Sequence, residues 1–315
     1  MVPIVHSQDA YFSQFNANRL EMNPAWAGVE EDIRRVFLNY RNQYPGLGNT
    51  YVTYSASYDQ YMEQAHGGLG FRIMNDRQGE GALSEFAISG IYAYHLKVTR
   101  QLSFNAGFEA SFVQRSLDGS GFIFSDMIDP VTGQIVEGNE QYGKNKTDFP
   151  DFKIGFTTFY KNFYGGVSMA HLFKPNRSLS SDPNGRLPRK LVVHAGSMIP
   201  VYERKLGRQV LVLSPNVVYI QQQSLNQLNY GMEAIVKDQF IAGIWARQNL
   251  GINFSSIIFS AGYVTKDFRI RYSYDQQLSS PTVRLPVLGA HELSLILTLS
   301  SEKKIKRQAI KCPKI

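Results

Sequence analysis

The sequence predicts an all-β chain that folds as a transmembrane antiparallel up-and-down β-barrel of about 14 strands. Three observations support this fold class. Apolar and polar residues alternate with a period of two along most of the chain, helical periodicity of any length is missing, and many alternating segments exceed the ~5–6 residues of an ordinary strand. Successive side chains of a strand point to opposite faces, so each such segment has one apolar and one polar face.

The composition argues against other classes. Apolar residues make up 43% and aromatic residues 13% of the 315 residues, which is too much for a disordered chain. No stretch approaches the ~18–20 uninterrupted apolar residues of a membrane helix. The best candidate, 191–202, contains His194 and Pro200. A barrel passes this test because its lipid-facing residues occupy only every second position.

The clearest alternation lies in 102–115, where Phe104, Phe108 and Phe112 alternate with polar residues such as Glu109. This length suits the ~9–11 residues of a tilted membrane strand. Several further segments alternate as clearly, and weaker ones fill the gaps. In chain order the expected strands are 34–44, 52–58, 67–75, 85–96, 102–115, 152–160, 163–173, 189–202, 209–222, 227–236, 239–248, 254–265, 268–275 and 292–299.

The links between these segments alternate in length. Those near 59–66, 97–101, 161–162, 203–208, 237–239 and 265–267 are mostly tight, whereas those near 45–50, 75–82, 116–148, 174–188, 222–227, 248–253 and 278–289 are generally longer. Outer-membrane barrels have short periplasmic turns and longer extracellular loops. An even strand number puts both chain ends on the turn side. We therefore expect an integral protein of the outer membrane with both termini in the periplasm.

Charged residues of the strands fall in the polar register. An Arg or Lys on the lipid face costs roughly 2–4 kcal/mol at mid-membrane, so we expect these side chains to face the lumen. The lumen-facing set is Arg72, Glu85, Glu109, Lys153, Glu233, Arg269, Arg271 and Glu292. The alternative is a soluble barrel or sandwich with an apolar core. Long strands with aromatic ends, such as Tyr94 and Tyr160, favour the membrane.

The net charge of +7 is concentrated in the C-terminal tail, where Lys303, Lys304, Lys306, Arg307, Lys311 and Lys314 outnumber Glu302. The rest of the chain is nearly neutral, and it holds no basic helix or RNA-binding signature, so we expect no nucleic-acid partner. The single cysteine, Cys312, allows no intrachain disulfide.

No catalytic or metal-binding motif of the GxSxG, HExxH, P-loop or CxxC type is present. We therefore expect no enzymatic activity, cofactor or metal. His95 or His171 beside an inward Ser would suit a membrane-embedded hydrolase, but a lumen His satisfied by its neighbours is favoured. Glu85 and Glu109 could form an acid–base pair, although contacts with inward Arg and Lys are favoured. Residues 126–133 resemble a calcium turn without EF-hand spacing, and we treat them as a loop.

Both ends of the chain depart from the strand pattern. The sequence divides into a remnant of an export signal or an ordinary N-terminus (1–7), an N-terminal periplasmic or plug-like segment (8–32), the barrel (33–300) and a basic periplasmic tail (301–315). We expect 8–30 to fold into the periplasmic mouth with Met22 and Trp26 as anchors, the alternative being a disordered leader. The tail could bind an acidic periplasmic partner or anionic lipid headgroups.

Short motifs stand at both ends. The N-terminal segment holds Phe-Ser-Gln-Phe at 12–15 and Asn-Pro-Ala-Trp-Ala-Gly at 23–28, and Lys-Cys-Pro stands at 311–313 after the basic run. Together they resemble the PorP/SprF family of outer-membrane proteins of the type IX secretion system, whose members carry an F-S/T-Q-Y/F box, an N-P-A-Y/W-A-G box and a similar C-terminal end. The resemblance implies a partner-binding set of Gln14, Asn23, Pro24, Trp26, Gly28, Lys311, Cys312 and Pro313.

The resemblance further implies a non-enzymatic barrel that supports secretion or surface anchoring of an adhesin-like substrate through its C-terminal domain, with related proteins serving gliding motility. The implied partners are outer-membrane lipid, the secreted adhesin's C-terminal domain and periplasmic or peptidoglycan-associated type IX components. A channel for a hydrophobic or small polar solute stays open, because about 14 strands lie between the ~8 of a filled barrel and the ~16–18 of an aqueous channel. The long link 116–148 favours the anchor, since it offers an external docking surface.

Overall fold

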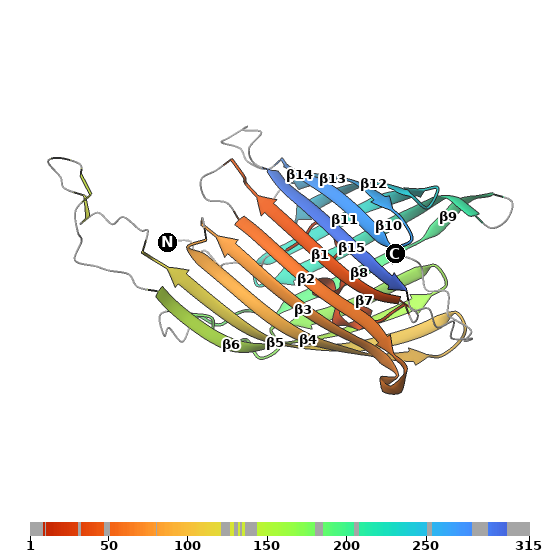
Figure 1. Cartoon of the computed structure of the whole chain (residues 1–315), viewed down its shortest axis with the longest axis horizontal. Helices are drawn as coiled ribbons and strands as arrows, with labels where there is room; N and C mark the ends of the chain where they lie inside the picture. The colour runs from red at the N-terminus through yellow and green to blue at the C-terminus, as the bar shows by residue number, and fades with distance from the viewer. Residues whose placement is uncertain are drawn as a thin grey trace.

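The computed structural model is an antiparallel β-barrel whose interior is occupied by the N-terminal part of the chain (Figure 1). It describes residues 9, 11–30, 33–46, 51–79, 81–120, 127–128, 132, 134–135, 144–179, 185–204, 208–250, 254–278 and 289–300. The short helices are α1 (Arg19–Met22), η1 (Pro24–Trp26) and η2 (Glu63–Ala65). The strands are β1 (Ile33–Gln43), β2 (Tyr51–Met62), β3 (Gly67–Gln78), β4 (Leu83–Lys97), β5 (Leu102–Asp118), β6 (Lys144–Tyr160), β7 (Phe163–Ala170), β8 (Lys190–Ser197), β9 (Ile199–Arg204), β10 (Arg208–Gln222), β11 (Leu225–Val236), β12 (Phe240–Asn249), β13 (Phe254–Val264), β14 (Phe268–Gln277) and β15 (Gly289–Ser300).

The sheet closes on itself. Successive strands pair antiparallel, and β1 pairs with β15 from Ile33 opposite Ser300 to Gln43 opposite Ala290. The strands β8 and β9 both pair with β10 and share one position in the wall, so the closed barrel has 14 positions. The predicted fold class is confirmed, and the strand expected at 189–202 is interrupted at Met198.

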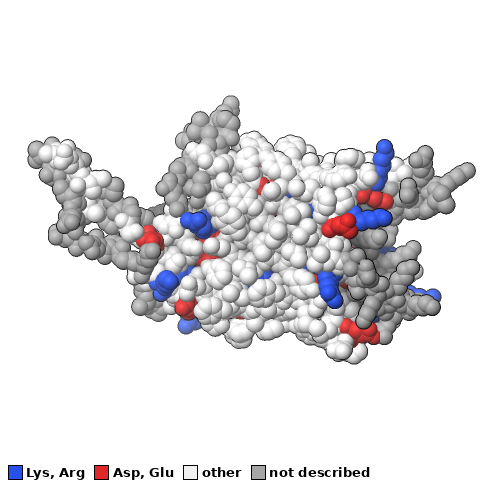
Figure 2. All heavy atoms as spheres, in the orientation of Figure 1, with Lys and Arg blue, Asp and Glu red and all other residues white. Residues whose placement is uncertain are grey.

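The apolar face of the wall points outward. On β5, Phe104, Phe108 and Phe112 are 46%, 44% and 53% exposed, whereas Glu109 between them is 1% exposed. In the view of Figure 2, charged side chains gather near the two ends of the barrel, and the band between them is mostly uncharged. This is the arrangement of a barrel in lipid, and it is the reverse of a soluble barrel with an apolar core.

The two ends of the barrel differ as the link lengths predict, with three exceptions. At the end that we call the turn end, β6 and β7 are separated by two residues, 161–162; at the opposite end, the loop end, β5 and β6 are separated by 119–143. Two loop-end links, 79–82 and 250–253, have four residues each, which is no more than 63–66 and 98–101 at the turn end. The third exception is the link between β10 and β11. We expect a longer loop near 222–227, but only residues 223–224 separate these strands.

The described residues before β1, which are 9 and 11–30, form a segment inside the barrel that we call the lumenal segment. Most of its side chains are buried, and Phe15, Leu20, Met22 and Trp26 form one apolar cluster with wall residues. No helix among the described residues has the length and apolar character needed to cross a membrane.

The lumenal segment runs through the barrel from one end to the other. Asp9 contacts His171 in the loop-end link after β7, and Gly28 contacts Asp59 near the turn end of β2. The two ends of the wall, Ile33 and Ser300, lie opposite each other at the turn end, whereas both termini of the chain, which we expect on this side, fall outside the described residues. The described chain begins at the loop end, because the lumenal segment spans the lumen instead of folding into the turn-end mouth alone.

Candidate functional site: the lumenal segment and its docking surface

The site with the densest polar contacts is the surface between the lumenal segment and the inner wall. Near the loop end, the carboxylate of Glu292 accepts hydrogen bonds from two consecutive backbone N–H groups, those of Ser13 (2.7 Å) and Gln14 (3.0 Å). The side-chain Nε2 of Gln14 donates to Ser273 Oγ and to the backbone oxygen of Glu292, both at 3.1 Å. The wall thus fixes the position of the first box of the sequence.

The hydroxyl of Ser13 lies at the centre of a group that we call the serine clamp, formed by Arg41, Arg247, Asp275 and Glu292. It donates to Asp275 Oδ2 (2.5 Å) and accepts from Arg41 Nη1 (2.7 Å) and Arg247 Nη2 (2.6 Å). Both guanidinium groups also lie 3.0 Å from Asp275 Oδ2. Two cations and two carboxylates balance each other here, so the clamp holds a neutral residue without an uncompensated buried charge.

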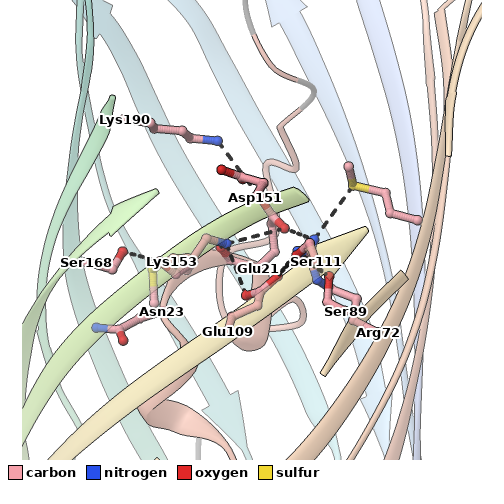
Figure 3. Close-up of polar contacts among 12 residues, drawn as sticks. Glu21, Asn23, Arg72, Ser89, Glu109, Ser111, Asp151, Lys153, Ser168 and Lys190 are labelled. Carbon is pink, nitrogen blue, oxygen red and sulfur yellow. Dashed lines mark hydrogen bonds and ion pairs between the residues drawn. The ribbon is translucent and has the colours of Figure 1, made fainter. Parts of the chain in front are cut away.

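A second ion-pair group surrounds Glu21 of α1, at mid-height in the lumen (Figure 3). The carboxylate of Glu21 contacts the guanidinium of Arg72, which also contacts Glu109. Lys153 Nζ donates to the backbone oxygen of Glu21 (2.8 Å) and lies 3.4 Å from Glu109 Oε2. Lys190 Nζ lies 3.9 Å from the other oxygen of Glu21. Glu21 thereby adds a second carboxylate to Glu109 in a group that contains three cations, from β3, β6 and β8.

Asn23 connects the lumenal segment to three strands. Its Nδ2 lies within 3.0–3.2 Å of Thr157 Oγ1, of His194 Nε2 and of the backbone oxygens of Phe156 and Val167. Its Oδ1 accepts from Ala25 N at 2.9 Å and caps η1, which begins at Pro24. An Asn cap followed by Pro at the first helical position is a favoured helix start.

Glycines in the wall let the segment approach the strands closely. Gly107 on β5 lies opposite Gly155 on β6. A Cβ at Gly107 would collide with the backbone of Pro24 and Ala25, and one at Gly155 would collide with the side chain of Asn23. Glycine in a strand often marks such a close approach of another backbone.

Trp26 fills an aromatic pocket formed by residues of β6 and β7. Its side chain is 1% exposed, and its ring meets Phe159 and Tyr164 edge-on, with centroids 4.9 Å and 5.2 Å away. The guanidinium carbon of Arg19 lies 5.5 Å from the Trp26 ring centroid. Edge-on aromatic contacts add to the stabilisation that comes from burial.

Gly28 contacts the wall near the turn end. Its φ is +63°, and a Cβ there would lie 2.5 Å from Gly68 Cα and 2.7 Å from Gln60 O. Its N–H donates to Asp59 Oδ2 (2.9 Å), and Asp59 in turn accepts two hydrogen bonds from Arg35, of 2.9 Å and 2.6 Å. Both the left-handed backbone and the close contact require glycine.

At the loop end His171 bridges the lumenal segment and the wall. Its Nε2 lies 2.8 Å from Asp9 Oδ2, and its Nδ1 lies 2.8 Å from Asp151 Oδ2. Burial opposes protonation, but the two carboxylates outweigh it and raise the pKa of His171 to about 9. A cavity of about 60 Å³ with lining charges of both signs, including Asp9, Glu85 and Arg115, lies beside this bridge and has room for a few waters.

The predicted site residues separate into three groups. Gln14, Asn23, Pro24, Trp26 and Gly28 are in the lumen and contact the wall, so a partner could reach them only after the segment leaves its place. Lys311, Cys312 and Pro313 lie outside the described residues, as do the signal remnant, the tail and most of 116–148.

The third group is the lumen-facing set. Its buried members are Arg72, Glu109, Lys153, Glu233, Arg271 and Glu292, and each makes an ion pair or hydrogen bond inside the barrel. Glu85 and Arg269 are half-buried. Glu109 thus meets Arg72 and Lys153, and among the described residues no group of three His, Cys, Asp or Glu is placed to bind a metal ion.

Sequence reasoning missed part of the docking surface. Arg41, Arg247 and Asp275 of the clamp lie in expected strands, but the alternation within each strand does not show that they meet across the intervening strands β13 and β15. Two wall glycines could have indicated the close approach of the lumenal segment from the sequence alone. Gly107 and Gly155 stand in the polar register of well-formed strands, where a missing side chain suggests that another part of the chain fills the space.

Comparisons with known proteins agree with this architecture. The model of the family "Type IX secretion system membrane protein PorP/SprF" matches residues 4–297. Among curated proteins, none matches the sequence significantly. A structural comparison finds the Ralstonia pickettii toluene transporter TbuX, with a TM-score of 0.51, 12% identity, and coverage of 89% of this chain and 92% of that one. The Pseudomonas putida toluene transporter TodX gives 0.48, 10%, 93% and 94%, and the Acinetobacter baumannii protein Omp33 gives 0.47, 7%, 86% and 100%.

Proposed function

Because this chain belongs to the PorP/SprF family of type IX secretion system membrane proteins, we propose that it is a non-enzymatic outer-membrane barrel that supports secretion or surface anchoring of an adhesin-like substrate through the substrate's C-terminal domain. One observation carries the proposal beyond the family. The lumen is occupied from end to end by the chain's own lumenal segment, so the barrel presents surfaces to partners instead of an open path for solutes.

The proposal assigns a side of the membrane to each end. The loop end faces outside and offers its links to the substrate's C-terminal domain. The turn end faces the periplasm, where the basic residues after Ser300 meet a type IX or peptidoglycan-associated component, or anionic headgroups. In this arrangement the box residues Gln14, Asn23 and Trp26 dock the segment. The partner contacts of the barrel lie at its ends.

The experiment is affinity purification of the full chain from the native outer membrane, followed by identification of the co-eluting proteins. We expect a secreted protein with a type IX C-terminal domain and at least one periplasmic component of the system. A reporter protein fused to that C-terminal domain should then bind to the purified barrel in vitro.

The second candidate, a channel for a hydrophobic or small polar solute, makes the opposite prediction. Purified barrel in vesicles would pass solute or current with the lumenal segment in place, and it would co-elute with no secreted protein. Solute flux together with failure to capture the C-terminal domain would overturn the proposed function.

A further inference from the structure

The outer wall carries an apolar hollow of about 760 Å³ that is separate from the lumen. It lies over β8, β10, β11 and β12, between Phe163 at the start of β7 and Ile257 of β13. Small outward residues, Ala195 and Ala246, alternate in its lining with large ones such as Met232 and Ile244, which are 44% and 52% exposed. The small side chains leave space that the neighbouring large ones enclose.

The hollow coincides with a gap in the β-ladder. Pairing of β8 with β10 ends at Gly196 opposite Asn216, and pairing of β9 with β10 begins at Ile199 opposite Leu213. Pro215, which lies in the gap and lines the hollow, has no N–H to donate. The pairing on this side of β10 is therefore interrupted beside the hollow, whereas on the other side Pro215 lies opposite Met232 of β11.

The inner side of the same wall holds the lumenal segment. Tyr164 and Trp245 line the hollow, and their rings contact Trp26 and Phe15 with centroids 5.2 Å and 6.0 Å apart. The position of these two rings is fixed from inside by the lumenal segment. The hollow consequently has a firm inner boundary, as a binding site requires.

We propose that the hollow binds an acyl chain of a phospholipid from the leaflet at the turn end. The hollow is continuous with the outward apolar belt that contacts membrane hydrocarbon, and its volume lies in the range of small-molecule sites. A chain seated there gains dispersion contacts that a void would lose. The exposed Lys161, in the turn two residues before Phe163, offers a positive charge for the phosphate of the headgroup.

Native mass spectrometry of the full chain, purified in detergent and titrated with palmitoyl-oleoyl-phosphatidylethanolamine, tests this site. The variant Ala195→Phe/Ala246→Phe fills the hollow. The control Ala242→Phe/Ala261→Phe adds the same rings to outward positions of β12 and β13 that do not line it. We expect the first variant to raise the Kd for the lipid about fivefold, which corresponds to about 1 kcal/mol, and the control to bind as the wild type does.

Folding of every variant is checked by the heat-dependent gel shift of a closed barrel. Equal lipid retention by both double variants would overturn the proposal. A dimer that disappears only in the hollow-filling variant would also overturn it, because the occupant would then be a second copy of the chain. Lys161→Gln should weaken lipid retention. Unchanged lipid retention would show that Lys161 does not bind the headgroup phosphate and would overturn that part of the proposal. The proposal does not depend on the secretion function.

Discussion

The docking of the lumenal segment depends on single side chains that replace missing backbone partners. A chain without secondary structure brings unpaired N–H groups into the lumen, and these need acceptors. Glu292, which is 0% exposed, accepts from two consecutive N–H groups while Arg41 balances its charge. At this site one carboxylate accepts the backbone hydrogen bonds that the carbonyl groups of a neighbouring strand accept in a sheet.

Replacement of Glu292 by Gln tests this role at nearly constant volume. We expect the backbone of 11–18 to lose about 1–3 kcal/mol of protection, because charge-assisted hydrogen bonds disappear and Arg41 is left without one of its two carboxylates. Hydrogen exchange followed by mass spectrometry measures the loss in this peptide. Glu63→Gln, at an exposed position, serves as the control. Equal protection in both variants would show that the clamp does not hold the segment.

Gly28 and Gly79 provide a matched pair at the same scale. Both have positive φ, +63° and +60°, but a Cβ at Gly28 meets Gly68 and Gln60, whereas one at Gly79 meets nothing within 4 Å. Ala at either position adds left-handed strain of about 1 kcal/mol. We expect Gly28→Ala to lower the unfolding temperature more than Gly79→Ala and to speed hydrogen exchange in 24–30. Identical effects would mean that the close contact has no energetic role.

At the scale of elements, the strands were predictable and the lumenal segment was only partly so. Alternation is local, so Phe104 to Phe112 indicates both a strand and its lipid face without knowledge of the rest of the chain. The lumenal segment has no such period. Its path depends on Asp9 reaching His171 and on Gly28 reaching Asp59, contacts of which the first spans 162 residues. The sequence thus indicated the boxes but not the direction in which the segment crosses the lumen.

The bridge between Asp9, His171 and Asp151 predicts a pH-dependent attachment of the segment's first residues. The pKa of about 9 exceeds the unfolded value of about 6.5. The bridge therefore stabilises fully below pH 6.5, and its contribution, at most about 3 kcal/mol, is lost as the pH rises through about 9. Arg177 and Lys190 also face Asp9 and keep its carboxylate charged over this range.

The variant His171→Asn removes the titrating group and tolerates the left-handed backbone at this position, where φ is 56°. We expect it to unfold at a lower temperature than the wild type at pH 6 and at the same temperature near pH 10, where the wild-type imidazole is neutral. Unfolding temperatures of both proteins at pH 6, 7.5, 9 and 10 give the measurement. A constant difference across this range would exclude a protonated His171 as its cause.

At the scale of the whole molecule, wall and lumenal segment form one charge-balanced interior. Strands bring Arg72, Lys153 and Lys190 inward, and the segment brings Glu21 to them. In the opposite direction, the wall supplies Glu292 and Asp275 to the polar groups of Ser13 and Gln14. The wall and the lumenal segment therefore supply ion-pair and hydrogen-bond partners to each other, and the segment is an integral part of the folded barrel.

This reciprocity predicts what happens when the segment is removed. The ladders of the wall are independent of it, so a chain lacking 11–30 should still close into a barrel with the heat-dependent gel shift. Its charged inner side chains would then be solvated in an open lumen. We expect single-channel conductance in planar bilayers to rise from near the baseline to that of an aqueous pore. Glu292→Gln, which frees only part of the segment, should give brief openings. A folded deletion variant with unchanged conductance would show that something other than the lumenal segment closes this barrel.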